Sequence, residues 1–231
     1  MKSFFLIVIV FSKTFFYILW SFLQPSRLQE LVQKWAQSAM RSFGYKVQIH
    51  GEPPPLENRA MILVGNHMSY LDIVLLMSVT RGIVFIAKNE VRNWPIIGYG
   101  AARAKTIFVE RDNKENRAQV RLQIAQQLKQ YQSKVVVFPS GTTTLDEDRP
   151  WKRGIFEVAA EAGLPVKAFH LDYSPRRESA YIDDDSLIGQ MKLQSDLKNK
   201  QAVLTWLDEY NVDDVAVNAE NIRQKVVAQF K

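Results

Sequence analysis

Apolar residues follow three different patterns along the chain. Residues 4–23 are apolar on nearly every face, with one polar interruption at Ser12-Lys13-Thr14. Residues 26–44 place apolar side chains at helical spacing, which predicts an amphipathic helix that stops at Gly44. From Tyr45 onward, short β-rich runs alternate with helical ones. The chain is therefore expected to have two N-terminal helices followed by a region of alternating strands and helices.

The alternating region predicts six strands and five helices. The strands are expected at Lys46–His50, Ala60–Val64, Ile83–Ala87, Thr106–Val109, Lys134–Phe138 and Val166–Leu171. The helices are expected at Leu71–Val79, Lys114–Tyr131, Gly154–Glu161, Leu197–Tyr210 and Ala219–Phe230. Such alternation predicts an α/β fold with a mixed, largely parallel central sheet flanked by helices. We expect membrane-associated helices over residues 1–44 and an α/β domain over residues 45–231, with a helical C-terminal tail from about residue 176.

The first apolar segment is long enough to span a bilayer. No cleavage site for a signal peptidase follows Leu23, because Gln24-Pro25 comes next. A spanning helix, a helix lying in one leaflet and a buried helix of a soluble domain remain as alternatives. The interruption at Lys13 favours the one-leaflet helix, with the lysine reaching the interface.

Charge and composition narrow the classes of partner. Residues 1–175 carry 22 basic and 14 acidic side chains, whereas residues 176–231 carry 8 and 10. A basic N-terminal region beside an apolar helix suits an anionic membrane surface or a phosphorylated ligand. No nucleic-acid partner is expected, because the basic residues are dispersed and no recognition helix is apparent. The chain has no Cys, which excludes disulfides, cysteine metal sites and a thiol nucleophile.

His67 and Asp72 form the first candidate for chemistry. His67 directly follows a predicted strand, and Asp72 lies five residues later where a helix begins. An Asp at that distance can reach back to the imidazole and orient it as a general base. Spacing alone leaves the alternative of a helix-capping Asp and a hydrogen-bonded core His. The acidic run Asp183-Asp184-Asp185 is expected to be a solvated loop or helix start, and no metal site is expected.

Three further segments follow in order along the chain. Residues 104–111 form a strand that ends at Arg111, residues 137–143 run from a strand into a turn rich in glycine and hydroxyls, and residues 163–168 feed another strand. With Asn66, His67 and Asp72, this set resembles the glycerolipid acyltransferases, in particular the lysophosphatidate acyltransferases. The resemblance covers about residues 60–172.

The resemblance implies acyl transfer from acyl-CoA or acyl carrier protein, as co-substrate, to the hydroxyl of a lysolipid in phospholipid biosynthesis. It implies no other cofactor and no covalent acyl-enzyme. His67 would be the base and Asp72 its orienting partner, both catalytic. The remaining residues implied to bind substrate are Asn66, Lys88, Lys105, Arg111, Ser140, Gly141 and Thr142. It also implies association with a membrane, expected to be a bacterial inner membrane with the site on its cytoplasmic side.

The chain departs from the family's pattern at three positions. Ser140 stands where the family has Glu, Thr143 where it has Arg, and Lys105 where it has Gly. These changes remove a carboxylate and a bidentate phosphate donor. Lys105 and Lys152 are the candidates for a relocated phosphate contact. The main expectation for the acceptor is 1-acyl-glycerol-3-phosphate. The alternatives are a lyso-aminolipid such as lyso-ornithine lipid, another lysophospholipid, or a non-catalytic lipid-binding homologue.

Overall fold

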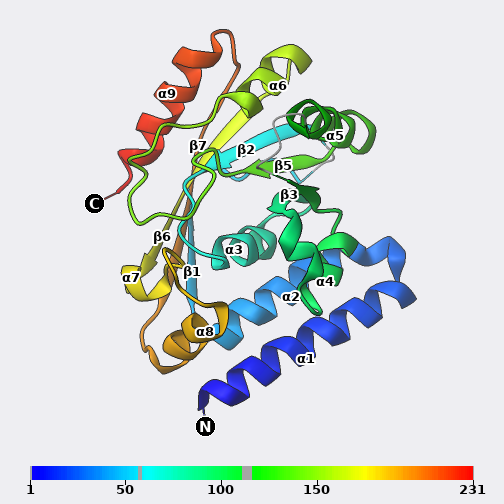
Figure 1. The fold of residues 1–231 in the computed structure, drawn as a ribbon, viewed down its shortest axis with the longest axis vertical. Helices are drawn as coiled ribbons and strands as arrows, with labels where there is room; N and C mark the ends of the chain where they lie inside the picture. Colours follow the sequence, from blue (N-terminus) through cyan, green and yellow to red (C-terminus); the bar gives the residue numbers. More distant parts are fainter. Residues whose placement is uncertain (1, 57–58, 111–115, 231) are drawn as a thin grey trace.

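The computed structural model describes residues 2–56, 59–110 and 116–230 as an α/β structure around one seven-stranded sheet (Figure 1). The strands lie in the order β1-β7-β6-β2-β5-β3-β4. Their bounds are β1 Lys46–His50, β2 Met61–Gly65, β3 Ile83–Lys88, β4 Ile107–Val109, β5 Lys134–Val137, β6 Val166–Ser174 and β7 Gln201–Tyr210.

All neighbouring strands are parallel except β6 and β7, which pair antiparallel. The prediction of a mixed, largely parallel sheet is confirmed. All five residues of β2 are buried, as expected for a central parallel strand with both faces covered.

Helices cover both faces of the sheet (Figure 1). On one face, α5, α6 and α9 pack over a core that includes Ile62, Val64 and Phe156. On the other face, α2 and α3 pack over a core that includes Leu63, Leu71 and Phe169. The helices are α1 Lys2–Leu23, η1 Pro25–Arg27, α2 Leu28–Phe43, α3 Leu71–Val79, η2 Asn89–Asn93, α4 Ile97–Arg103, α5 Asn116–Tyr131, α6 Gly154–Ala162, α7 Arg176–Ser179, α8 Leu187–Asp196 and α9 Val215–Val227.

The two N-terminal helices lie side by side along one side of the molecule (Figure 1). Helix α2 ends at Gly44, as predicted, and Gly44 adopts the left-handed conformation with φ of 77°. Helix α1 continues through its polar interruption, and two residues of the interruption contact α2. Lys13 Nζ donates to Ser42 Oγ at 2.8 Å, and Trp35 Nε1 donates to Thr14 Oγ1 at 3.0 Å. In the structure, Lys13 thus contacts α2.

The predicted helix at Leu197–Tyr210 is also wrong, because most of this segment is strand β7. Ala202, Leu204 and Trp206 alternate as buried residues, and β7 lies between β1 and β6. Valine, threonine and tryptophan favour this pleated environment. The expected C-terminal tail is consequently not helical throughout.

The segment between β6 and β7 contains two short helices that the sequence pattern did not predict, α7 and α8. The acidic run lies just before α8, whose first turn is capped by Ser186 Oγ accepting from Gly189 N. Helix α9 begins at Val215, earlier than predicted, because the Asp214 side chain accepts from Ala216 N and Val217 N.

Candidate functional site

The candidate site lies at the edge of the sheet where β2, β3 and β5 end. Carboxyl ends of parallel strands meet at one edge, where ligands commonly bind in α/β folds. His67 follows β2, Lys88 ends β3 and Ser140 follows β5. Gly65, the last residue of β2, determines the path of the chain just before His67. A Cβ at this position would collide with the ring and the carbonyl of Phe169 on β6. Only glycine allows β2 and β6 to pair this closely just before the loop that carries His67.

His67 and Asp72 are brought into direct contact. His67 Nδ1 lies 2.7 Å from Asp72 Oδ2, and Asp72 is fully buried in the first turn of α3. The same Oδ2 atom accepts from the backbone N–H groups of Met68 and Ser69 at 2.7 and 2.9 Å. Helix α3 thus begins with a carboxylate that organises the loop before it.

Tyr173 completes the coordination of Asp72 from β6. Its hydroxyl donates to Asp72 Oδ1 at 2.6 Å. Burial, and next to it the charge of Asp72, raise the pKa of the Tyr173 phenol well above its ordinary value, which keeps the phenol a donor. An ionised carboxylate can only accept hydrogen bonds, so in this contact Nδ1–H of His67 is the donor and Asp72 Oδ2 the acceptor.

The imidazole of His67 is also held by stacking. It lies parallel to the Phe138 ring, with centroids 3.9 Å apart and an interplanar angle of 7°. The backbone carbonyl of His67 accepts from Thr144 N at 2.8 Å. The side chain is 19% exposed, so the ring is held on several sides and still reaches the surface.

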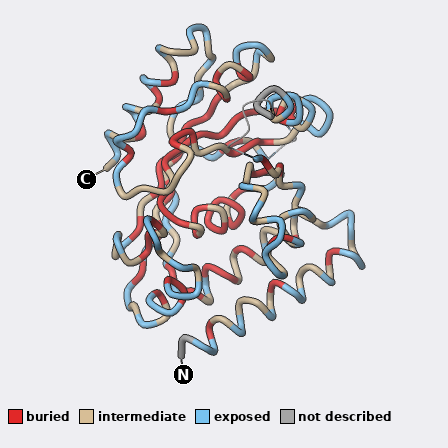
Figure 2. The backbone as a smooth tube through the Cα atoms, viewed as in Figure 1, coloured by how far each residue is buried: buried red, intermediate tan, exposed pale blue. Residues whose placement is uncertain are grey.

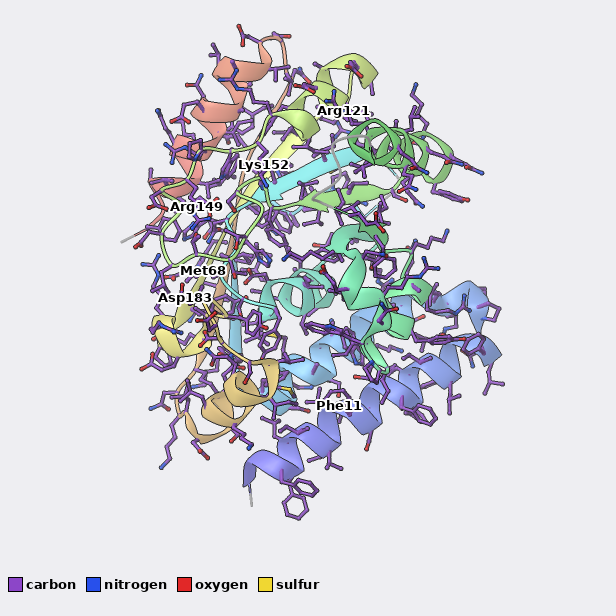
Figure 3. The ribbon with its side chains drawn as sticks, viewed as in Figure 1. Phe11, Met68, Arg121, Arg149, Lys152 and Asp183 are labelled. Carbon is purple, nitrogen blue, oxygen red and sulfur yellow. The ribbon has the colours of Figure 1, made fainter. Side chains whose placement is uncertain are left out.

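The turn after β5 lies beside this histidine. Ser140 is buried, and its hydroxyl donates to the carbonyl of Thr142 at 3.1 Å. Gly141 has φ of 78°, and its N–H donates to Phe138 O at 3.0 Å. A Cβ at Gly141 would collide with Lys152 Nζ, which places that ammonium over the turn. Figure 3 shows Lys152 and Met68 on the side of the sheet where β2 ends.

The other expected substrate-binding residues are not all gathered at this edge. Both polar atoms of the Asn66 amide bond the backbone of Leu171, at 2.8 Å each, so this side chain joins β6 to the loop after β2. Lys88 is exposed at the end of β3. Lys105 precedes β4 at the opposite edge of the sheet, with Nζ 4.2 Å from the centroid of the Tyr131 ring. Arg111 lies outside the described residues.

Two residues that contact the His67–Asp72 pair were missed in the sequence: Tyr173 and Phe138 as a stacking partner. Strand alternation from Phe169 and Leu171 places Tyr173 on their face, but the predicted strand stopped at Leu171.

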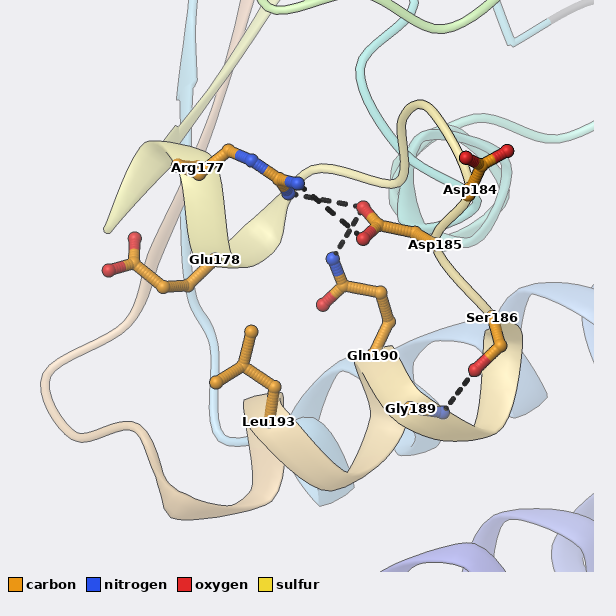
Figure 4. Close-up of a pocket in the computed structure, with 8 residues that line it drawn as sticks. All are labelled: Arg177, Glu178, Asp184, Asp185, Ser186, Gly189, Gln190 and Leu193. Atoms are coloured by element: carbon orange, nitrogen blue, oxygen red, sulfur yellow. Dashed lines mark hydrogen bonds and ion pairs between the residues drawn. The ribbon is translucent and has the colours of Figure 1, made fainter.

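A hollow of about 400 Å³ lies beside α7 and α8, and the acidic run contributes to its lining (Figure 4). Some of the charged side chains that line this hollow form hydrogen bonds and ion pairs within it. Asp185 Oδ2 accepts from Arg177 Nη1 at 3.1 Å and from Gln190 Nε2 at 2.8 Å. Tyr181 N donates to Met68 O at 2.8 Å, which ties this segment to the loop of His67. In the described part of the chain, no three Asp, Glu or His side chains converge as a metal site would require.

His170 has a different environment from His67. It is 3% exposed on β6, edge-on to the Phe230 ring at 4.5 Å. Neither ring nitrogen has a well-formed hydrogen bond within the described chain. Burial, with a smaller contribution from the charge of Arg176 and partly offset by Asp172, lowers the pKa of His170 to about 4.

We expect His170 to make the fold sensitive to acid. Near pH 5 an unfolded histidine, with a pKa of about 6.5, binds a proton that folded His170 does not bind. Stability is therefore lost as pH falls from about 6.5 toward about 4, by roughly 2–3 kcal/mol at pH 4.5. In His170→Leu, the difference in unfolding free energy between pH 7 and pH 4.5 should shrink by about that amount. Denaturant titration in detergent measures it.

His50 provides the control for this prediction, because it is exposed on β1. His50→Leu should keep the acid sensitivity of the unaltered protein. An unchanged pH dependence in His170→Leu would contradict the prediction.

Comparison with known proteins identifies related sequences. A family model described as Acyltransferase matches residues 46–170, which is more than half of the chain. The chain is 31% identical over 168 residues to "Lyso-ornithine lipid O-acyltransferase" of Pseudomonas aeruginosa, covering 71% of this chain and 63% of that protein. It is 37% identical over 146 residues to the Rhizobium meliloti protein of the same name, covering 62% and 48%. A Neisseria gonorrhoeae "1-acyl-sn-glycerol-3-phosphate acyltransferase" is 32% identical over 124 residues, covering 53% and 48%.

One solved structure matches nearly the whole chain. It is the 1-acyl-sn-glycerophosphate (LPA) acyltransferase PlsC from Thermotoga maritima, with a TM-score of 0.68. The match covers 99% of this chain and 95% of that one at 18% sequence identity, so it establishes a shared fold. The sequence matches span less than two thirds of the relatives' own lengths.

Proposed function

The chain belongs to the acyltransferase family, and on that premise we propose that it is an O-acyltransferase that moves a fatty acyl group from a thioester to the hydroxyl of a lysolipid. The observation that carries this proposal is the contact of 2.7 Å between His67 Nδ1 and Asp72 Oδ2 at the carboxyl edge of the parallel strands. It leaves Nε2 of a partly exposed imidazole available as a base.

In the proposed reaction, His67 Nε2 takes the proton of the acceptor hydroxyl as its oxygen attacks the thioester carbonyl. The tetrahedral intermediate then collapses with cleavage of the carbon–sulfur bond. The thiolate leaves and receives the proton from the imidazolium. Asp72 stabilises that imidazolium through Nδ1, and no group of the protein is acylated.

We propose a lyso-aminolipid of the lyso-ornithine type as the acceptor. Two relatives named for that lipid match 71% and 62% of this chain, whereas the Neisseria relative named for 1-acyl-glycerol-3-phosphate matches 53%. A phosphomonoester would carry close to two negative charges, but positions 140 and 143 offer only hydroxyls. Lys152 is the cation placed over this turn, and a single lysine lacks the bidentate geometry of arginine. Acceptor 1-acyl-glycerol-3-phosphate is the second candidate.

An acceptor panel tests the proposal. The full chain, purified in detergent, is assayed with acyl-CoA and with acyl carrier protein as donors. The acceptors are lyso-ornithine lipid, 1-acyl-glycerol-3-phosphate and a lysophospholipid with a different head group. We expect kcat/KM for lyso-ornithine lipid to exceed that for the phosphate acceptor at least tenfold. The reverse order would establish the second candidate, and no transfer to any acceptor would leave the non-catalytic alternative.

We propose that α1 lies in one leaflet rather than across the bilayer. The helix is long and apolar enough to span, and only 11% of its most apolar window is buried. However, it is attached to the domain near both ends. Leu6 packs in the core of the α2–α3 face, and Arg103 Nη2 donates to Ser21 O at 2.9 Å. A spanning orientation would draw α4 and Arg103 into the membrane. Figure 2 shows that the exposed parts of α1 lie mainly on the side of the helix away from the sheet, and the exposed large apolar residues of the chain include several from α1.

With this orientation, we propose that residues 1–44 form the membrane-associated part and that residues 45–231 form the α/β domain above the membrane. Because acyl-CoA and acyl carrier protein are cytoplasmic, we place the site on the cytoplasmic face of a bacterial inner membrane.

Charging the exposed face of α1 should release the protein from membranes. Phe5, Phe16 and Leu19 are 62%, 56% and 50% exposed. Each such side chain contributes about 1.5–3 kcal/mol when it leaves water. The triple substitution to Glu should therefore lower partition onto anionic vesicles at least about tenfold. Vesicle co-sedimentation of the full chain measures the effect.

The matched control is Leu122→Glu, on an apolar side chain of α5 that is 71% exposed on the opposite face of the sheet. It should leave partition unchanged. Equal partition of the triple variant and the unaltered chain would contradict the proposed orientation.

A further inference from the structure

The hollow beside α7 and α8 contains a buried acceptor atom that has no donor. Gln190 on α8 is 3% exposed, and its Nε2 donates to Ala180 O at 2.7 Å and to Asp185 Oδ2 at 2.8 Å. These two acceptors fix the orientation of the amide, since only its nitrogen can donate to them. Gln190 Oε1 is buried and accepts no hydrogen bond from the described chain. Figure 4 shows this oxygen directed away from Asp185, toward the side of the hollow where Glu178 and Leu193 lie.

The charges around this oxygen are unbalanced. Three carboxylates and one guanidinium line the hollow, so its lining is net negative. Arg177 pairs with Asp185, with Nη1 and Oδ2 3.1 Å apart, whereas Glu178 and Asp184 form no ion pair within the described part of the chain. Leu193 is 43% exposed and adds an apolar wall. The hollow therefore suits a group that has N–H donors, a positive charge and an apolar stem, which describes a primary ammonium on a methylene chain.

Hydrogen bonds join the hollow to the loop that carries His67. Tyr181 N donates to the carbonyl of Met68 at 2.8 Å, and the rings of Tyr181 and Tyr70 meet edge to face at 5.8 Å. The Tyr70 hydroxyl donates to Gln194 Oε1 on α8 at 2.8 Å. Helix α8 also packs against α1 (Figure 1). The elements that form the hollow thus contact both the catalytic loop and the helix that we place at the membrane.

We propose that this hollow binds the side-chain ammonium of the acceptor head group and so selects a lyso-aminolipid. The inference rests on the proposed function and assigns the part of the acceptor that the chemistry at His67 does not touch. Glu178 and Asp184 would pair with the ammonium, and Gln190 Oε1 would accept one of its N–H groups. The methylene chain of the head group would lie on Leu193. The same carboxylates would repel a phosphate head group, so they discriminate against that acceptor as well.

Two forms of one acceptor test the proposal in the full chain in detergent. Acetylating the side-chain amine of lyso-ornithine lipid removes its charge and leaves the rest of the lipid unchanged. We expect kcat/KM for the unmodified lipid to exceed that for the acetylated lipid at least tenfold, mainly through KM. In the double variant Glu178→Gln, Asp184→Asn, this ratio should fall to within about twofold. Raising the ionic strength should lower the ratio in the unaltered protein only.

The matched control is the double variant Glu161→Gln, Asp208→Asn. It removes the same number of charges from exposed positions near the ends of α6 and β7, at the opposite edge of the sheet from His67. This variant should keep the ratio of the unaltered protein. A ratio within twofold in the unaltered protein, or the same ratio in the unaltered protein and in Glu178→Gln, Asp184→Asn, would overturn the proposal.

Binding without a thioester separates this proposal from the proposed function. The dissociation constant of lyso-ornithine lipid should be at least fivefold higher in Glu178→Gln, Asp184→Asn than in the unaltered protein. Weaker binding in that variant, in a protein that acylates no acceptor, would support the head-group site and reject the proposed function. Equal binding by the two proteins would overturn the site. Free ornithine that binds the unaltered protein as tightly as the lipid does would overturn its assignment to a lipid head group.

Discussion

His67→Ala should abolish measurable acyl transfer while the fold remains intact. A positioned general base contributes about 10²–10⁴-fold to a reaction rate. None of the described groups beside it replaces it, because Nδ1 of the same ring is bonded to Asp72 and the neighbouring Ser140 hydroxyl donates to the carbonyl of Thr142. We expect kcat/KM to fall by about 10³-fold or more, mainly through kcat.

The measurement is thioester-dependent acylation of a lysolipid by the full chain in detergent, together with a thermal unfolding curve. The ring of His67 is partly exposed, so its removal costs little packing energy beyond the stacking on Phe138. His50→Ala removes an exposed histidine from β1 and should keep full activity. A His67→Ala protein that is folded and retains activity within tenfold of the unaltered chain would eliminate the base mechanism.

The pairing of His67 with Asp72 was predictable because it is local. Five residues separate them across a loop and the first turn of a helix, so the contact depends on short-range geometry alone. The strands were predictable for a similar reason. Runs such as Met61–Gly65 are continuous apolar segments bounded by turn residues, which is the pattern of a strand buried on both faces.

Contacts between distant segments were not predictable from a single sequence. Tyr173 is separated from Asp72 by 101 positions and reaches it only because β6 pairs with β2 in a particular register. The sequence of β7 has a pattern of apolar residues that also fits a helix. The segment is a strand because it pairs with β1 and β6. Lys105 precedes the short strand β4, so it lies at the edge of the sheet opposite to that of His67, which follows β2.

The N-terminal helix illustrates how packing changes the meaning of a charge. From the sequence alone, a lysine within an apolar helix is energetically unfavourable in the bilayer core, which suggests that Lys13 lies at the membrane–water interface. In the fold, its bond to Ser42 and the bond between Thr14 and Trp35 turn the polar interruption into the contact between α1 and α2. The apolar residues then occupy the remaining face, and the helix is both attached to the domain and suited to a membrane surface.

Two substitutions of Asp72 should separate its catalytic role from its structural role. In Asp72→Ala the four donors that it accepts, from His67, Met68, Ser69 and Tyr173, lose their acceptor in a fully buried site. Each buried donor left unpaired costs about 1–3 kcal/mol, so we expect the unfolding free energy to fall by roughly 3–5 kcal/mol. In Asp72→Asn, the amide oxygen can accept from the first three donors. The amide nitrogen can then donate to the Tyr173 hydroxyl, which turns to accept, so the stability loss should be much smaller.

Activity should not follow stability in this pair. Both substitutions remove the negative charge that stabilises the imidazolium of His67, so kcat should fall by about 10²–10⁴-fold in each. Tyr173→Phe is the matched control, because it removes one donor and leaves the charge; we expect a modest change in stability and a far smaller loss of kcat. Denaturant titration and steady-state kinetics on the three variants provide the comparison. If kcat in Asp72→Asn stayed close to that of the unaltered chain, Asp72 would be a structural residue of the loop and His67 would act without it.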